Sequence, residues 1–127
     1  MQFLSKFSPQ AFALMRIVAG FLVLWHGSQK LFGFPAPAPG LPAWIIYGGG
    51  AIELVGGILV LIGLFTRPAA FLLSGLCAVA YFMVHASRGF FPLLNGGELA
   101  ALYSFVFLYI STHGAGIWSV DGSRRVG

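Results

Sequence analysis

Residues 51–65 read AIELVGGILVLIGLF and indicate the fold class most directly. Glu53 is the single charged side chain of this stretch, and every other residue in it is apolar or glycine. With the residues just before it, the stretch forms an apolar segment over about residues 44–65, and a helix of about 20 residues is enough to cross the hydrocarbon core of a bilayer. The segment therefore predicts a transmembrane helix with one acidic group inside it.

The composition of the whole chain is that of a membrane protein. Of its 127 residues, 58% are hydrophobic and only 8% are charged, against roughly 25% charged residues in soluble domains. So few charges cannot cover a water-soluble globule, which excludes an ordinary cytosolic enzyme and a disordered tail. The net charge of +4 does not indicate a nucleic-acid partner, because no basic cluster exceeds Arg124-Arg125 and such binding needs a basic stripe. The single cysteine, Cys77, excludes a disulfide framework and an intramolecular dithiol pair.

Three more apolar segments have the length of a span and cover about residues 9–32, 69–87 and 95–113. Residues 34–42 are too rich in proline to be helical and read as an extended loop, whereas the other connections are short, so consecutive helices should be antiparallel neighbours. We expect the first segment to be retained rather than cleaved as a signal peptide, because Arg16 and Lys30 interrupt or flank it. The sequence predicts a single integral membrane domain over residues 1–127: an all-α transmembrane four-helix bundle with up-down-up-down topology.

Four spans place both termini on the same side of the membrane. The basic residues on that side are Lys6, Arg67, Arg124 and Arg125, and those on the other side are Lys30 and Arg88. The positive-inside rule therefore predicts that both termini are cytoplasmic.

Ionisable side chains inside the first two spans are functional candidates, because charges within lipid are rare and usually face the bundle interior. Arg16, His26 and Lys30 fall within an arc of about 80° on one helix. His26 lies roughly 10 Å below the outer end of this helix, too deep for its short side chain to reach water. Glu53 is then either paired with one of these three cations or protonated by desolvation, and its role is either structural or that of a working site.

The third span carries a polar stripe. Ser74, Cys77, Tyr81 and His85 follow spacings of 3, 4 and 4, which place them on one face of a helix, and Arg88 extends the stripe at its outer end. Such a stripe either holds helices together by hydrogen bonds or lines a cavity.

The start of the fourth span has the spacing of a capping box, Asn95-Gly96-Gly97-Glu98. In a capping box the Asn95 side chain would accept from the Glu98 amide, and the Glu98 carboxylate would return to the Asn95 amide. A capping box would explain Asn95 and Glu98 without any ligand. The alternative hypothesis is that both residues have a functional role.

The antiparallel order of the helices should bring polar groups from all four spans together in the outer half of the bundle. The candidates for catalysis are His26, Glu53, His85 and Glu98, and those for ligand binding are Lys30, Tyr81, Arg88 and Asn95. The histidines would hydrogen-bond or protonate a ligand, and the acids would relay protons. No HxxH, HxxxH or CxxC spacing is present, so we predict no metal site. Histidine, tyrosine and aromatic walls would suit an apolar ring with carbonyls, such as a quinone head group.

The chain also resembles the DoxX family of small four-span membrane proteins over nearly its whole length. The segments that carry the resemblance are Arg16–Gly20, His26–Gly33, Glu53–Gly57, Gly63–Arg67, His85 with Gly89–Phe91, Asn95–Glu98 and Gly114–Asp121. The proline-rich stretch after Gly33 departs from the pattern, since relatives often carry a longer amphipathic segment there. The resemblance implies a four-helix bundle in the bacterial inner membrane. It also implies a link to redox chemistry, because some relatives are subunits of a thiosulfate:quinone oxidoreductase and others act in oxidative stress or thiol homeostasis, often with soluble partners.

The leading hypothesis is a membrane subunit of a quinone-linked redox system that takes electrons from a small sulfur compound or a soluble redox partner. The competing hypothesis is a non-enzymatic membrane anchor or assembly partner for a soluble redox or stress-response enzyme, with polar groups that only hold the helices together. A third, a small transporter, requires a homo-oligomer, because four short helices leave little room for a path through one chain.

Overall fold

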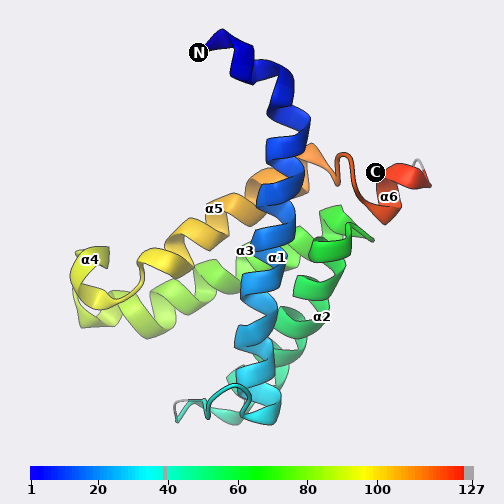
Figure 1. The fold of residues 1–127 in the computed structure, drawn as a ribbon. Coiled ribbons are helices and arrows are strands. Elements are labelled where there is room, and N and C mark those ends of the chain that lie inside the picture. The colour runs from blue at the N-terminus through cyan, green and yellow to red at the C-terminus, as the bar shows by residue number, and fades with distance from the viewer. Residues whose placement is uncertain (39, 125–127) are drawn as a thin grey trace.

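The computed structural model describes residues 1–38 and 40–124, and over these ranges the protein is all-α with no strand (Figure 1). The helices are α1 (Ser8–Phe32), α2 (Gly50–Ile62), α3 (Thr66–Ala80), α4 (Pro92–Asn95), α5 (Glu98–His113) and α6 (Val120–Ser123). Shorter turns adjoin them: the 3₁₀ turns η1 (Gln2–Phe7) and η4 (Ala86–Arg88), and the wider π turns η2 (Ile45–Gly49) and η3 (Tyr81–His85). Arg125, which the orientation prediction counted, lies outside the described residues.

Three continuous helical stretches are long and apolar enough to cross a membrane: Gln2–Phe32, Ile45–Ile62 and Thr66–Arg88. Large apolar side chains on these stretches, such as Phe21 and Phe71, are exposed. Extended apolar surface of this kind is typical of a face that contacts lipid. The chain is therefore an all-α membrane protein.

The helix α5 begins at Glu98, three residues later than the sequence predicted. The predicted start is wrong because Asn95 ends the short helix α4 and the next residue, Gly96, takes a left-handed conformation with φ of 76°. The capping box is also wrong: the Asn95 Oδ1 accepts from the Gly97 amide at 2.8 Å, and within the described ranges α5 has no side-chain cap at its N-terminus. The 16 residues of α5 extend about 24 Å, less than the roughly 30 Å of a hydrocarbon core.

The helices pack as two antiparallel pairs, α1 with α2 and α3 with α5, and α2 joins the pairs by packing against α3. Figure 1 shows the second pair crossing α1 steeply rather than running along it. Because α1 and α5 touch at only a few points, closure of the four helices into one bundle stays a prediction.

Glycines allow the close contact between α1 and α2. A Cβ on Gly20 would lie 2.6 Å from the backbone nitrogen of Leu61 and 2.7 Å from the carbonyl oxygen of Gly57. Real side chains do not approach backbone atoms so closely, so only glycine lets the two helices meet at this distance. The contact also fixes the register in which the last turn of α1 faces the first turn of α2.

Candidate functional site

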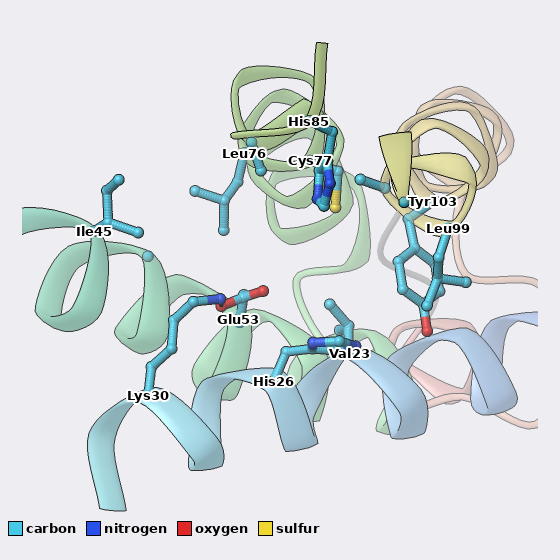
Figure 2. Close-up of a pocket in the computed structure, with 14 residues that line it drawn as sticks. Val23, His26, Lys30, Ile45, Glu53, Leu76, Cys77, His85, Leu99 and Tyr103 are labelled. Carbon is cyan, nitrogen blue, oxygen red and sulfur yellow. Dashed lines mark hydrogen bonds and ion pairs between the residues drawn. The ribbon is translucent and has the colours of Figure 1, made fainter. Parts of the chain in front are cut away.

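A cavity of about 240 Å³ lies between α1, α2, α3 and α5, near the end of the molecule at which α1 finishes. Most of its wall is apolar. The polar or titratable side chains that line it are His26, Lys30, Glu53, Cys77, His85 and Tyr103. Figure 2 shows them converging from different helices. Four of the eight predicted site residues, His26, Lys30, Glu53 and His85, are thus brought together.

Lys30 and Glu53 form an ion pair across the contact between α1 and α2, in which the Lys30 Nζ donates to the Glu53 Oε1. Lys30 is in the last turn of α1 and Glu53 is in the first turn of α2. The neighbouring Gly50 makes this approach feasible, since a Cβ there would already lie 3.0 Å from the Lys30 Cβ. Of the two arrangements left open for Glu53, pairing with a cation is the one observed, and Lys30 is the partner.

Arg16 does not reach Glu53, so that alternative is wrong. Its side chain is fully buried, and its guanidinium donates to the backbone carbonyls of Val60 at 3.1 Å, Ile117 at 3.0 Å and Trp118 at 2.7 Å. These carbonyls lie at the end of α2 and in the tail after α5, away from the cavity. Arg16 therefore fastens the tail to the first two helices.

The two cavity histidines come from different helical pairs. His26, on α1, is exposed and meets the ring of Tyr103 edge-on, with 6.2 Å between the ring centroids. His85, in the π turn η3, points its ring toward the cavity beside Cys77 (Figure 2). The His85 Nδ1 lies 3.3 Å from the backbone carbonyl oxygen of Asn95. Because a carbonyl oxygen can only accept, this hydrogen bond needs the proton on Nδ1 and leaves Nε2 of the neutral ring as an acceptor.

The other four predicted site residues do not line the cavity. Asn95 and Tyr81 support the connection between η4 and α5: the Asn95 Nδ2 donates to the Tyr81 hydroxyl at 3.3 Å and to the Gly89 carbonyl at 3.0 Å. Arg88 is exposed. Glu98 is also exposed and borders a separate, shallow hollow on the outside of α5. Asn95 thus touches the site only through the carbonyl that holds His85.

Two cavity residues, Cys77 and Tyr103, were absent from the predicted site. Cys77 is buried against the cavity, and the polar stripe of α3 could have placed it there. The stripe both lines the cavity, through Cys77, and joins two helices by hydrogen bonds. The Ser74 hydroxyl donates to the Ser104 carbonyl at 2.7 Å, and the Ser104 hydroxyl donates to the Ser74 carbonyl at 3.1 Å, which links α3 to α5. Tyr103 had no such signal, since α5 is apolar around most of its circumference.

The cavity combines hydrogen-bond donors with an apolar wall. Lys30 and His26 carry nitrogen donors, and Glu53 and His85 accept or exchange protons. Because Glu53 already balances the charge of Lys30, the site suits a neutral molecule with oxygen acceptors better than an anion. Within residues 1–38 and 40–124, no three His, Cys, Asp or Glu side chains are grouped so that they could hold a metal ion.

A family model described as DoxX matches residues 11–86, more than half of the 127 residues of the chain. The protein belongs to the DoxX family. Members of this family are small membrane proteins, and the resemblance seen in the sequence is confirmed. The DoxX match runs from α1 to η3, so it includes every cavity residue discussed above except Tyr103, which lies beyond it on α5.

This DoxX protein has relatives among curated proteins. An uncharacterized protein of Haemophilus influenzae is 46% identical over an alignment of 127 positions, and the match covers 93% of each chain. A second uncharacterized protein of that organism is 35% identical over 105 aligned positions, and the match covers 76% of this chain and 68% of the relative. A Bacillus subtilis protein named "Putative oxidoreductase CatD" is 27% identical over 113 aligned positions, and the match covers 85% of this chain and 82% of the relative. No solved structure matches the chain.

Proposed function

We propose that this protein is a membrane subunit of a redox system and that its cavity holds the head group of a quinone. The observation that carries the proposal is a small apolar cavity faced by the Lys30–Glu53 ion pair and by two histidines, His26 and His85. The name of the Bacillus subtilis relative, "Putative oxidoreductase CatD", supports a redox role.

The size and chemistry of the cavity fit a quinone ring. Its volume of about 240 Å³ is below the roughly 300–1,000 Å³ of pockets that enclose a whole drug-sized ligand, so a ring fits and a ring with a long chain does not. The two carbonyl oxygens of a quinone are neutral acceptors that lie at opposite edges of a flat ring. Lys30 and His26 on α1 provide donors at one edge, and His85 in η3 faces the cavity from the α3 side.

A quinone bound here supplies two-electron chemistry, since it takes up two electrons and two protons to become a hydroquinone. Lys30 and His26 would stabilise negative charge as it grows on the ring oxygens. Glu53 and His85, which are proton acceptors in the resting site, would take up protons from water and pass them to these oxygens. The electrons would come from a small sulfur compound or from a soluble redox partner.

The proposal includes an arrangement in the membrane. In it α5 is the fourth span, and both termini are in the cytoplasm of a bacterial inner membrane. Its support is the charge distribution, with Lys6, Arg67 and Arg124 toward one end of the helices and Lys30 and Arg88 toward the other. The cavity then lies in the half of the membrane opposite to the cytoplasm.

Binding of a ubiquinone and of a menaquinone analogue to the purified protein in detergent tests the proposed function. We expect one of the two classes to bind, and we expect His26→Ala and Glu53→Gln to raise the Kd about tenfold, equivalent to about 1.4 kcal/mol. Glu98→Gln is the matched control, because Glu98 is exposed and lies outside the cavity, and it should bind as the wild type does. If neither quinone class binds, the proposal is wrong and the non-enzymatic anchor is favoured.

A further inference from the structure

A narrow apolar groove of about 50 Å³ adjoins the cavity on the side of η2 and α3. Its lining consists of apolar residues and one glycine. Ile45, Gly49, Leu76 and Ala80 line both the groove and the cavity. These four residues therefore form a common wall, with the polar site on one side of it and the groove on the other.

The far side of the groove faces the membrane rather than water. Val79 and Met83, which line the groove but not the cavity, are 47% and 52% exposed. Both lie within the apolar stretch Thr66–Arg88, which is long enough to span a bilayer. In a bilayer, lipid chains would therefore contact this rim, and the groove would lie between the cavity and the membrane interior.

Gly49 lies where the two spaces meet, and neither the backbone nor the packing requires a glycine there. Its φ of −64° and ψ of −42° are helical. A Cβ would lie 3.7 Å from the Leu76 Cδ1 and 4.0 Å from the Ile45 Cγ2, which are ordinary contact distances, in contrast to Gly20. Glycine is less stable than alanine within a helix. What the missing side chain does provide at Gly49 is a thinner wall between the cavity and the groove.

We propose that the ligand of the cavity is an amphiphile whose apolar chain passes Gly49 and leaves through the groove into the membrane. This inference rests on the proposed function and specifies its ligand: a head group with a long apolar chain rather than a small water-soluble molecule. This ligand agrees with the cavity volume, which accommodates only the head group. Its apolar chain would be buried against the apolar residues of the groove, which favours binding. The ligand enters sideways from the bilayer.

A comparison of two quinones tests the groove. One carries a ten-carbon alkyl chain and the other is the same head group without a chain. Gly49→Val adds a side chain at the junction, and we expect it to weaken binding of the chain-bearing quinone about tenfold more than binding of the chainless one. Gly48→Val is the matched control, because a Cβ on Gly48 meets nothing within 4 Å and Gly48 lines neither space. Gly49→Ala, which adds only a methyl group, should act in the same direction with a smaller effect.

The inference is overturned if Gly49→Val weakens both quinones equally or neither. It is also overturned if Gly48→Val has the same effect as Gly49→Val. Equal weakening of both quinones would mean that the added side chain disturbs the head-group site itself rather than the path of the chain.

Cys77 allows a second test that does not depend on quinone binding. It is the single cysteine of the chain and it lines the cavity, so its reaction with mercurials in liposomes reports access to the cavity. We expect membrane-soluble phenylmercury to react faster than its impermeant sulfonated analogue, and Gly49→Val but not Gly48→Val to slow phenylmercury about tenfold. Cys77→Ser sets the background.

The mercurial result separates failure of the groove from failure of the proposed function. Equal rates for the two reagents, no reaction with either, or no effect of Gly49→Val would overturn the membrane route. If labelling depends on Gly49 but no quinone binds, the groove serves an amphiphile of another kind and only the quinone proposal fails.

Discussion

Lys30 and Glu53 carry opposite charges into an apolar interior, where side-chain exposures are 17% for the lysine and 10% for the glutamate. Moving either charge out of water is unfavourable, and the attraction between them offsets this only while both are present. Each residue therefore stabilises the fold only while the other is present, whether or not a ligand is bound. Single and double substitutions separate this structural dependence from a role in binding.

Removing one charge should be more harmful than removing both. We expect Lys30→Met and Glu53→Gln each to lower the free energy of unfolding by about 3 kcal/mol, because an unpaired buried charge remains. The double variant should recover part of that loss, and unfolding in detergent without ligand measures all three. Arg88→Met, at an exposed position, is the control and should have little effect. Additive losses in the double variant would show that the two charges are not coupled.

The contact between α1 and α2 is the element-level feature that makes this pair form. Gly20→Ala would push a Cβ into the backbone of α2, and the two helices would have to separate. We expect it to lower the free energy of unfolding by about 1–3 kcal/mol. Gly75→Ala is the matched control, because a Cβ on Gly75, in α3, meets nothing within 4 Å and should stabilise the helix by about 0.5–1 kcal/mol. Unfolding in detergent measures both, and equal stability of the two variants would argue against the glycine contact.

A helix can be predicted from the sequence when it depends on residues within the same segment. The three long apolar stretches could be predicted because the length of an apolar segment is visible in the chain itself. The start of α5 could not, since the spacing of Asn95 and Glu98 fits a capping box equally well whether or not Gly96 turns to the left-handed conformation that it adopts. With that turn, Glu98 is displaced to the exposed side of α5 and away from the cavity.

The cavity was predictable in part for a related reason. His26, Lys30, Glu53 and His85 could be placed together because charges in lipid must face inward and the helix order sets their depth. The choice of Lys30 over Arg16 as the partner of Glu53 could not be predicted. Arg16 donates to backbone carbonyls. Because every residue has a backbone carbonyl, no pattern of side chains in the sequence identifies which carbonyls Arg16 will bind.

At one end of the molecule, hydrogen bonds attach the tail after α5 to the helices, and at the other end lies the cavity. At the first of these ends, Arg16 donates to carbonyls of the tail after α5. The Asp121 carboxylate of the tail accepts from the backbone amides of Phe65 at 3.1 Å and Thr66 at 2.9 Å, where α3 begins. Arg67 adds a hydrogen bond to the Thr112 carbonyl at 2.7 Å. At the other end, α1 and α5 touch little and leave the cavity between them. Stability of the tail and affinity for a ligand should therefore be separable.

Asp121→Asn tests this separation through its pH dependence. Burial by itself raises the pKa of the Asp121 carboxyl, but hydrogen bonds from Thr66 and Phe65, together with the charge of Arg124, hold the pKa below its ordinary value of 3.8. The carboxylate therefore stabilises the fold fully above that ordinary value, and its contribution is lost as the pH falls through the lower folded value. We expect Asp121→Asn to lower the free energy of unfolding by about 1 kcal/mol at neutral pH, with the difference from the wild type shrinking below pH 3.8. Quinone affinity at neutral pH should stay unchanged, and a parallel loss of affinity would show that the two ends are coupled after all.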